Sequence, residues 1–523
     1  MKYDVIVIGG GSGGGVTAAR LSEDPSRSVL LLEAGPEFPD FETIPGNIKY
    51  LYGPDIERGS RGHGRGKGGG TFMWGYVAKT TDRSGMVRLP RGKVLGGSSS
   101  LNTAALMRGE PEDYDSWAAQ GLDEWSYEKC LPYFRKLEHD MDFPGGDFHG
   151  SAGPVEVRRF GKDQWLPAST AFYNACRDMG FPDNPDYNYP GATGVGAMPF
   201  NQSEDGVRLS TALAYLAPAR HRLNLTIRAN TVVHRILFDG RKAIGVLVES
   251  EGQMFTLEGE QIILCAGAVA SPQLLMLSGV GPADHLKELG IPIIQDLPGV
   301  GQNLQEDAGC QLKFRTKPGF ELDPDKPRLQ LYVRYADPAF NERNDIMIGC
   351  TPFAIERGGD RMNAYGISMN AMMYLHSGKG EIKLASTDVH VQPNMDYKML
   401  EVASDRARLR EGVRTGARIA EHPEFKDIIE ERIAPTDDIL YDDDALDDYM
   451  LRNCGSTVHI SCTCKMGLPS DPMAVTDQYG RVFGVDGLKI ADASVMVDQP
   501  RAATNCPTMM IAEHMADFTK QGL

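Results

Sequence analysis

The chain has 523 residues, a soluble composition and a formal net charge of −17. A chain of this length is too long to fold around a single hydrophobic core, which indicates two domains, or one large domain with a lid. The acidic balance argues against nucleic acid or an anionic membrane as the general partner, and no apolar run approaches the length of a membrane span. The nine cysteines are scattered, which favours a reducing compartment. With a strand pattern directly after Met1, no signal peptide is expected, and the protein is predicted to be cytoplasmic.

The first predicted elements are an apolar strand at residues 5–8, a glycine-rich turn and a helix that extends to about Leu21. Gly9 allows a tight bend, Gly11 lets the backbone approach a pyrophosphate, and Gly14 lets the helix pack on the strand. The phosphates are therefore expected at the N-terminus of this helix.

A second apolar strand at residues 29–32 ends at Glu33, whose carboxylate is placed to bind the ribose hydroxyls of an adenosine. Strand, glycine turn and acid together predict a Rossmann-like dinucleotide site. On these residues alone the nucleotide is either FAD or NAD.

The next distinctive segment, residues 58–70, is rich in glycine and arginine: seven of the twelve residues from Gly59 to Gly70 are glycine. Its basic residues are Arg58, Arg61, Arg65 and Lys67. Such a segment cannot bury a core and is predicted to be a mobile, solvated loop. The alternatives are an entrance lid or a docking arm for an acidic partner.

Residues 151–200 are rich in Pro, Gly, Asn and aromatic residues, which predicts loops and short strands. Strands are expected at residues 225–229, 232–238 and 243–248, followed by a buried strand from residue 261 that meets the glycine turn at Gly267. This last strand is expected to rejoin the nucleotide-binding sheet.

Residues 311–400 contain stretches that alternate apolar and polar positions, as at 367–371 and 380–384, which predicts a half-solvated antiparallel sheet. Helices are expected at residues 405–422 and 445–451, the second started by three aspartates. This part of the chain is the candidate substrate domain.

Three ordered stretches resemble the glucose-methanol-choline (GMC) oxidoreductase family, and the resemblance covers nearly the whole chain. They are Pro90–Asn102 (PRGKVLGGSSSLN), Gly267–Pro282 (GAVASPQLLMLSGVGP) and the block from His459 to Asp517. The resemblance implies an α/β fold with a Rossmann-like FAD-binding domain and an α+β substrate domain built on a largely antiparallel sheet. The expected FAD-binding domain is discontinuous (1–155, 205–310 and 456–523), and residues 156–204 and 311–455 form the substrate domain.

The family resemblance resolves the nucleotide to FAD, with Val233 near the adenine and Asp492 near the ribityl phosphate. Turn and resemblance together assign these residues to the cofactor: Gly9, Gly11, Ser12, Gly14, Glu33, Arg91, Leu95, Gly96, Gly97, Ser98, Asn102, Val233, Ala266, Asp492, Ala493, Asn505, Pro507 and Thr508. Some family members attach FAD through a histidine where this chain has Leu101, so the FAD is expected to be noncovalent. No metal is expected.

Alcohol oxidation needs a base for the hydroxyl proton, and His459 is the histidine in the matching motif. Asn505 is placed where the family carries a second histidine or an asparagine, and its amide could orient the substrate oxygen. His514 falls outside the motif and is expected to be structural.

The chain departs from the family motif at Ile460, Cys462 and Lys465, where proline, glycine and arginine are usual. A larger side chain at position 462 is expected to narrow the pocket beside the base, which puts the family's familiar substrates in doubt. Cys462 and Cys464 are too close, and without partner cysteines, to build a tetrahedral metal site, so both are expected to serve packing.

The predicted function is FAD-dependent oxidation of a small-molecule alcohol to an aldehyde or ketone, with electrons passed to O2 or a quinone-like acceptor. One alternative is a non-oxidative flavoenzyme of the same fold, a lyase or photodecarboxylase. An NAD-dependent dehydrogenase would explain the N-terminal turn but leaves the stretches at Arg91–Asn102 and Gly267–Pro282 unused.

Overall fold

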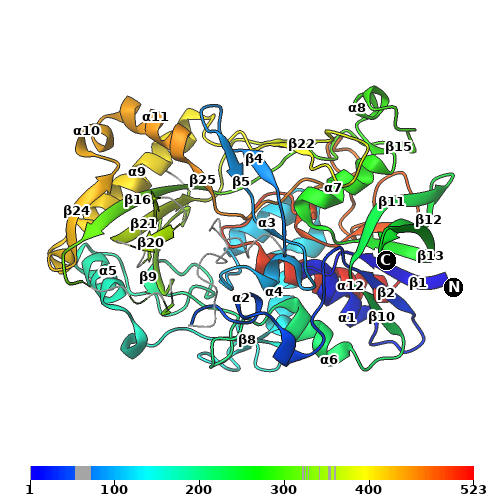
Figure 1. Cartoon of the computed structure of the whole chain (residues 1–523), viewed down its shortest axis with the longest axis horizontal. Coiled ribbons are helices and arrows are strands. Elements are labelled where there is room, and N and C mark those ends of the chain that lie inside the picture. Colours follow the sequence, from blue (N-terminus) through cyan, green and yellow to red (C-terminus); the bar gives the residue numbers. More distant parts are fainter. Residues whose placement is uncertain are drawn as a thin grey trace.

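The computed structural model describes residues 2–53, 72–320, 323, 325–327, 329–340, 342–351, 355–358, 361–364 and 366–523. The predicted loop at 58–70 lies outside these residues. Two large sheets occupy opposite ends of the long axis, and both chain termini lie at the end that carries the first sheet (Figure 1). The predicted α/β class with two sheet-based units is confirmed, while the boundaries proposed for the two domains stay a prediction.

The first sheet is the nucleotide-binding sheet. Its strands are, in spatial order, β10 (Leu225–Arg228), β2 (Val29–Leu32), β1 (Lys2–Ile8), β13 (Gln253–Leu264), β12 (Lys242–Ser250) and β11 (Thr231–Asp239), with β26 (Leu488–Ile490) also pairing with β13. The β10, β2, β1, β13 and β26 pairings are parallel, whereas β11, β12 and β13 form antiparallel hairpins. The strand expected from residue 261 therefore does rejoin this sheet, and β2 is an uninterrupted apolar run because both its faces are buried.

The helix after the glycine turn, α1 (Ser12–Leu21), ends where the sequence predicted and packs beside the C-terminal helix α12 (Asn505–Lys520). Gly9 has a φ of +96°, which favours glycine. A Cβ atom on Gly14 would lie 1.8 Å from the carbonyl oxygen of Gly9. The predicted roles of these two glycines, a tight bend and close helix packing, are confirmed.

The second sheet is antiparallel throughout. Its strands are, in order, β24 (Ile429–Ala434), β16 (Ala308–Thr316), β21 (Gly366–Met373), β18 (Ile346–Thr351), β17 (Leu331–Tyr335) and β9 (Gly194–Ala197), with β25 (Gly455–Ser456) pairing with β16. The expectation that it is half-solvated is wrong, because seven of the eight residues of β21 are buried. The helices α5 (Pro167–Asp178) and α9 (Ala403–Ala420) contact the sheet, and Tyr332, Met347 and Met372 belong to a second apolar cluster with Phe160 and Phe200.

Two further expectations need correction. The alternating segment 380–384 contains β22 (Glu381–Lys383), which belongs instead to a small sheet with β23 (Asn394–Asp396), β4 (Val77–Lys79) and β5 (Met86–Arg88). Helix α5 lies within residues 151–200, where only loops and short strands were expected. The expected helices at 405–422 and 445–451 are confirmed as α9 and α11 (Asp443–Asn453), and the Asp442 side chain caps α11 by accepting from the Ala445 amide at 2.8 Å.

The remaining helices and strands of the described residues complete the fold. They are α2 (Gly46–Lys49), α3 (Pro111–Ala119), α4 (Tyr127–Leu137), α6 (Ala217–Ala219), α7 (Gly267–Leu277), α8 (Ala283–Glu288), α10 (Asp437–Leu440), β3 (Met73–Trp74), β6 (Arg91–Gly92), β7 (Glu138–Asp140), β8 (Val155–Val157), β14 (Val280–Gly281), β15 (Gln295–Asp296), β19 (Ile355–Gly358) and β20 (Arg361–Ala364).

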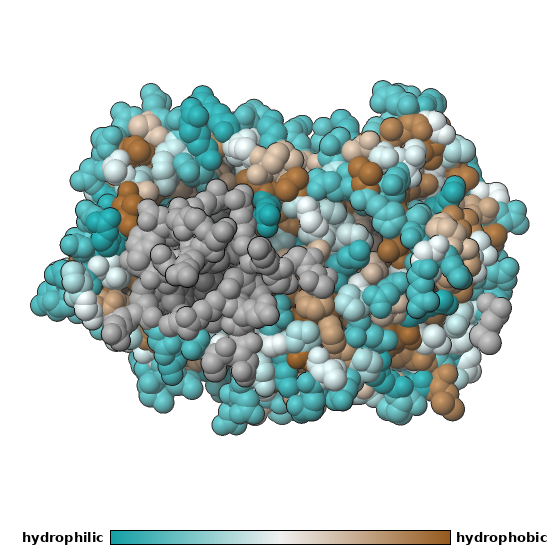
Figure 2. Space-filling model, viewed as in Figure 1, coloured by the Kyte–Doolittle hydropathy of each residue, from teal (hydrophilic) through white to brown (hydrophobic). Residues whose placement is uncertain are grey.

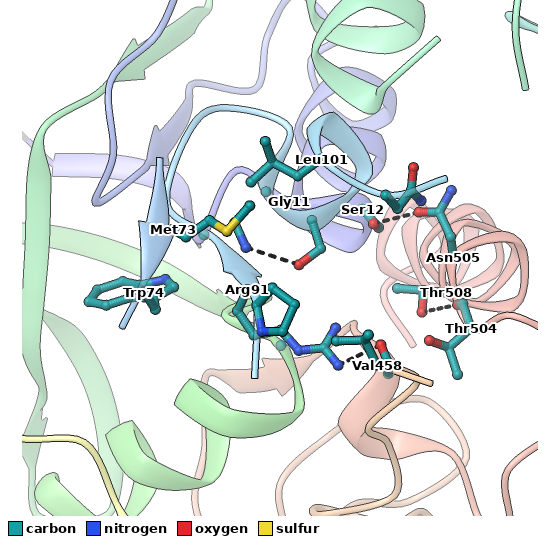
Figure 3. Close-up of a pocket in the computed structure, with 18 of the residues that line it drawn as sticks. Gly11, Ser12, Met73, Trp74, Arg91, Leu101, Val458, Thr504, Asn505 and Thr508 are labelled. Atoms are coloured by element: carbon teal, nitrogen blue, oxygen red, sulfur yellow. Dashed lines mark hydrogen bonds between the residues drawn. The ribbon is translucent and has the colours of Figure 1, made fainter. Parts of the chain in front are cut away.

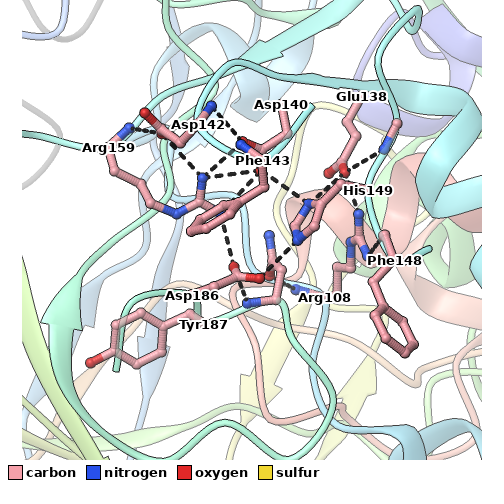
Figure 4. A network of polar contacts seen from close by, with 12 residues as sticks. Arg108, Glu138, Asp140, Asp142, Phe143, Phe148, His149, Arg159, Asp186 and Tyr187 are labelled. Atoms are coloured by element: carbon pink, nitrogen blue, oxygen red, sulfur yellow. Dashed lines mark hydrogen bonds and ion pairs between the residues drawn. The ribbon is translucent and has the colours of Figure 1, made fainter. Parts of the chain in front are cut away.

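A buried polar network around His149 joins β7 to the loop before β9 (Figure 4). The imidazole contacts Glu138 through Nδ1 at 3.0 Å and Asp186 through Nε2 at 2.8 Å, while Arg159 pairs with Asp140 at 2.9 Å. Burial opposes the charged form of His149, but hydrogen bonds to the surrounding carboxylates outweigh it and raise its pKa to about 10. The network therefore holds a protonated histidine inside the protein at neutral pH.

The surface agrees with the charged composition, since the outline of the face in Figure 2 is mostly hydrophilic. Among the residues described, no helix has both the length and the apolar character needed to cross a bilayer.

Candidate active site

A cavity of about 360 Å³ extends from the glycine turn to His459. Most of the predicted site residues line it: Gly9, Gly11, Ser12, Glu33, Arg91, Gly97, Ser98, Asn102, Val233, Ala266, His459, Asp492, Ala493, Asn505 and Thr508. Figure 3 shows Ser12 and Asn505 together on one side of this cavity and Trp74 on the opposite side, with Arg91 between them. The structure thus brings together residues that the sequence places up to about 500 positions apart.

Four residues predicted to bind the cofactor do not line the cavity: Gly14, Leu95, Gly96 and Pro507. Gly96 has a φ of +90° and its amide donates to the Gly10 carbonyl at 2.7 Å, so it shapes the turn behind the lining residues. A Cβ atom on Gly10 would lie 2.7 Å from the Leu95 side chain, which shows how closely these two loops approach.

At the nucleotide end, Glu33 is fixed by the backbone. Its Oε2 accepts from the Gly10 amide at 2.9 Å and its Oε1 from the Gly35 amide at 2.8 Å. Burial raises the pKa of Glu33 to about 7, against the opposing effect of these amides. Each carboxylate oxygen retains a second lone pair, so the side chain can still accept from ribose hydroxyls.

Asn505 is tied to the nucleotide turn. Ser12 Oγ donates to Asn505 Oδ1 at 2.7 Å, and the buried Nδ2 of Asn505 has no hydrogen-bond partner among the described residues (Figure 3). A Cβ atom added to Gly11 would meet Gly97 Cα at 3.7 Å, an ordinary contact distance. An unpaired buried donor beside the glycine turn fits a bound dinucleotide.

Asp492 joins the stretch Gly267–Pro282 to the C-terminal block. Its Oδ2 accepts from the Gly267 amide at 2.8 Å and from Ser271 Oγ at 2.5 Å, and its Oδ1 accepts from the Ser494 amide at 2.8 Å. Burial raises the pKa of Asp492, which these hydrogen bonds oppose. The residue therefore positions the start of α7 against the cavity.

At the other end, His459 is held by a buried carboxylate. Its Nδ1 lies 2.8 Å from Asp307 Oδ2 and 3.0 Å from Thr457 Oγ1, and Asp307 Oδ2 also accepts from Gln499 Nε2 at 2.8 Å. Because Nδ1 is engaged, Nε2 is the nitrogen left for a ligand in the cavity. Burial lowers the pKa of His459 to about 4, so the imidazole is neutral at neutral pH.

A second carboxylate, Glu306, holds the segment before His459. It accepts from the His459 amide at 2.8 Å, and the Thr457 and Ser456 hydroxyls each donate to it at 2.8 Å. Sequence reasoning missed both Glu306 and Asp307. The available signal was the adjacent acidic pair that follows nine residues without charge, 297–305.

The two roles predicted for Asn505 differ in support. Its hydrogen bond to Ser12 places it beside the nucleotide turn, which favours the cofactor-binding role. No hydrogen bond between Asn505 and His459 is found in the part of the chain that the structure describes. The substrate-orienting role stays a prediction.

The expectation that Cys462 narrows the pocket is wrong. Its side chain is fully buried, does not line the cavity and lies 3.3 Å from Ser461 Oγ. Cys462 has a φ of +71°, a backbone conformation that glycine adopts without strain. Backbone conformation, not pocket volume, therefore explains why glycine suits this position.

His514 lies on α12 outside the cavity, which agrees with the structural role expected for it. Its ring stacks on Tyr133 with centroids 4.1 Å apart and packs against Phe518 at 4.2 Å. Burial lowers the pKa of His514 to about 3.

Aromatic side chains form part of the cavity wall, and Trp74 among them lies on the side opposite Asn505 (Figure 3). Those that line the cavity are Tyr50, Tyr52, Trp74, Tyr76, Phe160 and Phe200. Trp74 and Tyr76 stack with an interplanar angle of 3° and centroids 5.6 Å apart. This wall offers flat apolar surface to a ligand.

One cavity contains both the glycine turn of a Rossmann-like sheet and a neutral histidine held by a buried carboxylate. This combination defines a dinucleotide-dependent enzyme. Models of the GMC oxidoreductase family match residues 3–308 and 376–512. The chain belongs to the GMC oxidoreductase family, and it is an FAD-dependent oxidoreductase.

Similar proteins span the full length of the chain. The oxygen-dependent choline dehydrogenase of Burkholderia pseudomallei (strain 1710b) is 35% identical over 99% of this chain and 93% of its own length. An uncharacterized GMC-type oxidoreductase of Rhodococcus erythropolis is 34% identical over 98% and 97%. Among solved structures, pyridoxine 4-oxidase from Mesorbium loti superposes with a TM-score of 0.89 at 27% identity, covering 99% of both chains.

Proposed function

We propose that this protein oxidises a small-molecule alcohol to an aldehyde or ketone, with His459 as the base and with O2 or another acceptor taking the electrons. The observation that carries the proposal is the neutral His459 imidazole, anchored through Nδ1 to buried Asp307 in the cavity of the nucleotide turn. FAD, when bound, supplies the hydride acceptor.

The protein's own residues account for the proton. In the tautomer that carries its proton on Nδ1 and donates it to Asp307, His459 keeps a lone pair on Nε2 that can take the hydroxyl proton of the alcohol. Burial raises the pKa of Asp307 and of Glu306, whereas a positive charge on His459 favours their ionised forms. The imidazolium and the two carboxylates beside it therefore stabilise one another. Because the surrounding donors already hold both carboxylates in place, little reorganisation is required when the charge develops.

We also propose that the FAD is held noncovalently. The residues suited to hold it are those of the nucleotide turn, Glu33, Asp492 and the N-terminus of α12. The Leu101 side chain that lines the cavity is aliphatic and carries no nucleophile. Acid precipitation should release yellow flavin into the supernatant; colour that stays in the washed pellet would contradict noncovalent binding.

The aromatic wall suggests which alcohols to test first. Flat rings bind aromatic substrates by stacking and cationic groups by cation–π contact. Choline and pyridoxine appear in the names of two similar proteins, and one is a quaternary ammonium alcohol and the other an aromatic alcohol. Aromatic and cationic alcohols therefore head the list, before sugars and simple aliphatic alcohols.

An anaerobic flavin-reduction screen over these four classes tests the proposal. An alcohol oxidoreductase bleaches the visible flavin absorbance when its substrate is added, whereas a lyase or photodecarboxylase does not. Reoxidation of the reduced protein by air, compared with artificial quinone-like acceptors, then identifies the electron acceptor. Failure of every alcohol to bleach the flavin would contradict the proposed function.

A further inference from the structure

Three potential metal ligands meet on the surface, outside the active-site cavity. His234 lies on β11, Glu249 on β12, and His390 in the segment between β22 and β23. The Nε2 atoms of His234 and His390 lie 2.8 and 2.9 Å from the same oxygen, Oε2 of Glu249. All three side chains are partly exposed, with side-chain exposures of 22%, 31% and 47% for His234, Glu249 and His390. A solvent cation can therefore reach all of them.

We propose that His234, Glu249 and His390 form a binding site for a divalent transition-metal cation of the Zn²⁺ type. Imidazole nitrogen and carboxylate oxygen are the ligands that Zn²⁺ accepts, with water filling a fourth position. Tetrahedral Zn²⁺ at its usual bond lengths places ligand atoms about 3.3–3.5 Å apart. The three ligand atoms already lie within 4.8 Å of one another, so small side-chain rotations are enough.

The backbone at two of the ligands is fixed in advance. His234 falls where the register of β11 against β12 shifts between Val233 and Arg235, a bulge of the kind that re-aims a side chain. On the other side, Gln273 of α7 donates to the carbonyls on both sides of His390, those of Val389 at 3.3 Å and Val391 at 3.1 Å. The fold thus already brings these ligands close together, so little further conformational entropy is lost when a cation binds.

Charge separates this cluster from a second histidine–carboxylate cluster outside the active site, around His149. There, arginines pair with the carboxylates of Glu138 and Asp140 and take the place that a cation would need. Among the ion pairs of the described residues, Glu249 is paired with the two histidines and with no lysine or arginine. Two neutral imidazoles and one carboxylate leave a net charge of −1, which a dication would reverse.

The position of the cluster links it to the cofactor cavity. Val233 and Val389, the chain neighbours of His234 and His390, both line that cavity. A bound cation would connect the β11–β12 hairpin to the segment around His390 across the nucleotide end. We therefore expect the cation to slow the loss of FAD.

The test is equilibrium dialysis of the tag-free holoenzyme against Zn²⁺ alone, followed by metal analysis. We expect one tightly bound Zn²⁺ per chain. Glu249→Gln and His390→Ala should each weaken binding by at least about 10- to 100-fold, the loss seen when even the outer shell of a metal site is changed. His221→Ala removes an exposed histidine outside the cluster and should leave binding unchanged. The flavin spectrum of each variant confirms that the fold is retained.

A second readout is the rate of FAD release, followed by flavin fluorescence in mild denaturant. Zn²⁺ should slow release at least several-fold in the wild type and in His221→Ala, and not in Glu249→Gln or His390→Ala. Zinc binding that survives both ligand substitutions, or that His221→Ala also weakens, would overturn the proposal. Both readouts are independent of whether an alcohol is the substrate.

Discussion

Replacing Asp307 by asparagine should slow alcohol oxidation by about 1,000-fold while leaving the FAD in place. The carboxylate oxygen lies 2.8 Å from His459 Nδ1, and the side chain is completely buried. Opposite charges about 4 Å apart interact by about 4 kcal/mol at an effective dielectric constant near 20. Since each 1.36 kcal/mol is a factor of ten in rate, loss of this stabilisation of the imidazolium corresponds to about three orders of magnitude. Asparagine can also donate to Nδ1, which favours the tautomer with no lone pair on Nε2.

The assay is anaerobic stopped-flow measurement of flavin reduction with the alcohol that performs best in the screen. Asp498→Asn is the matched control, because Asp498 is a nearby, partly exposed aspartate that pairs with Lys379 at 2.9 Å. It makes no hydrogen bond or ion pair with His459 among the described residues. The control should stay within about twofold of the wild type. If Asp307→Asn retains more than about a tenth of the wild-type rate with normal FAD content, Asp307 does not support the base and the electrostatic argument fails.

Three further outcomes are expected. His459→Ala should keep FAD but reduce it at least about 100-fold more slowly, the low end of general-base assistance; near-normal reduction would remove His459 from this role. Gly14→Ala should destabilise the fold by about 1–3 kcal/mol or more and lower the FAD content, because its Cβ would lie 1.8 Å from a backbone oxygen. The control Gly146→Ala, whose Cβ would have no atom within 4 Å, should have neither effect. Equal melting temperatures of the two variants would refute this prediction. Burial lowers the pKa of His376 to about 4, below the unfolded value near 6.5, so the unfolded chain binds a proton that the folded chain does not and stability falls as pH drops from 6.5 to 4. In the His376→Gln variant, the decrease in the free energy of unfolding between pH 6.5 and 4 should be smaller by roughly 3 kcal/mol. An unchanged pH dependence of the free energy of unfolding would show that His376 is not buried in its neutral form.

The nucleotide half of the site was predictable because its signals are local. Strand β1, the turn at Gly9 and Gly14, and Glu33 lie within about 30 residues, and each has a conformational or packing requirement that few residue types meet. The β21 segment misled prediction for the opposite reason. Its alternation of apolar and polar residues is typical of a sheet with one wet face, yet tertiary packing covers both faces.

The support of the catalytic base could not be predicted locally either. Asp307 and His459 are 152 positions apart and meet only because β25 pairs with the start of β16. The sequence motif identifies the histidine but not its partner, because a hydrogen bond between distant segments does not require a fixed spacing in the sequence. Only the fold shows that the acidic pair at 306–307 faces the histidine.

The environment of His459 combines two opposing electrostatic effects, and their balance suits a base. Burial lowers the pKa of the imidazole to about 4, which keeps Nε2 free of a proton before the alcohol arrives, while the charge of Glu306 acts in the opposite direction. A histidine with burial alone would be a poor proton acceptor, and one with carboxylates alone would already be protonated in weakly acidic solution. The surrounding donors hold Glu306 and Asp307 close to the ring, so the imidazolium gains its stabilisation at the moment the proton is transferred. The two carboxylates are therefore as much a part of the proposed chemistry as the histidine that the motif revealed.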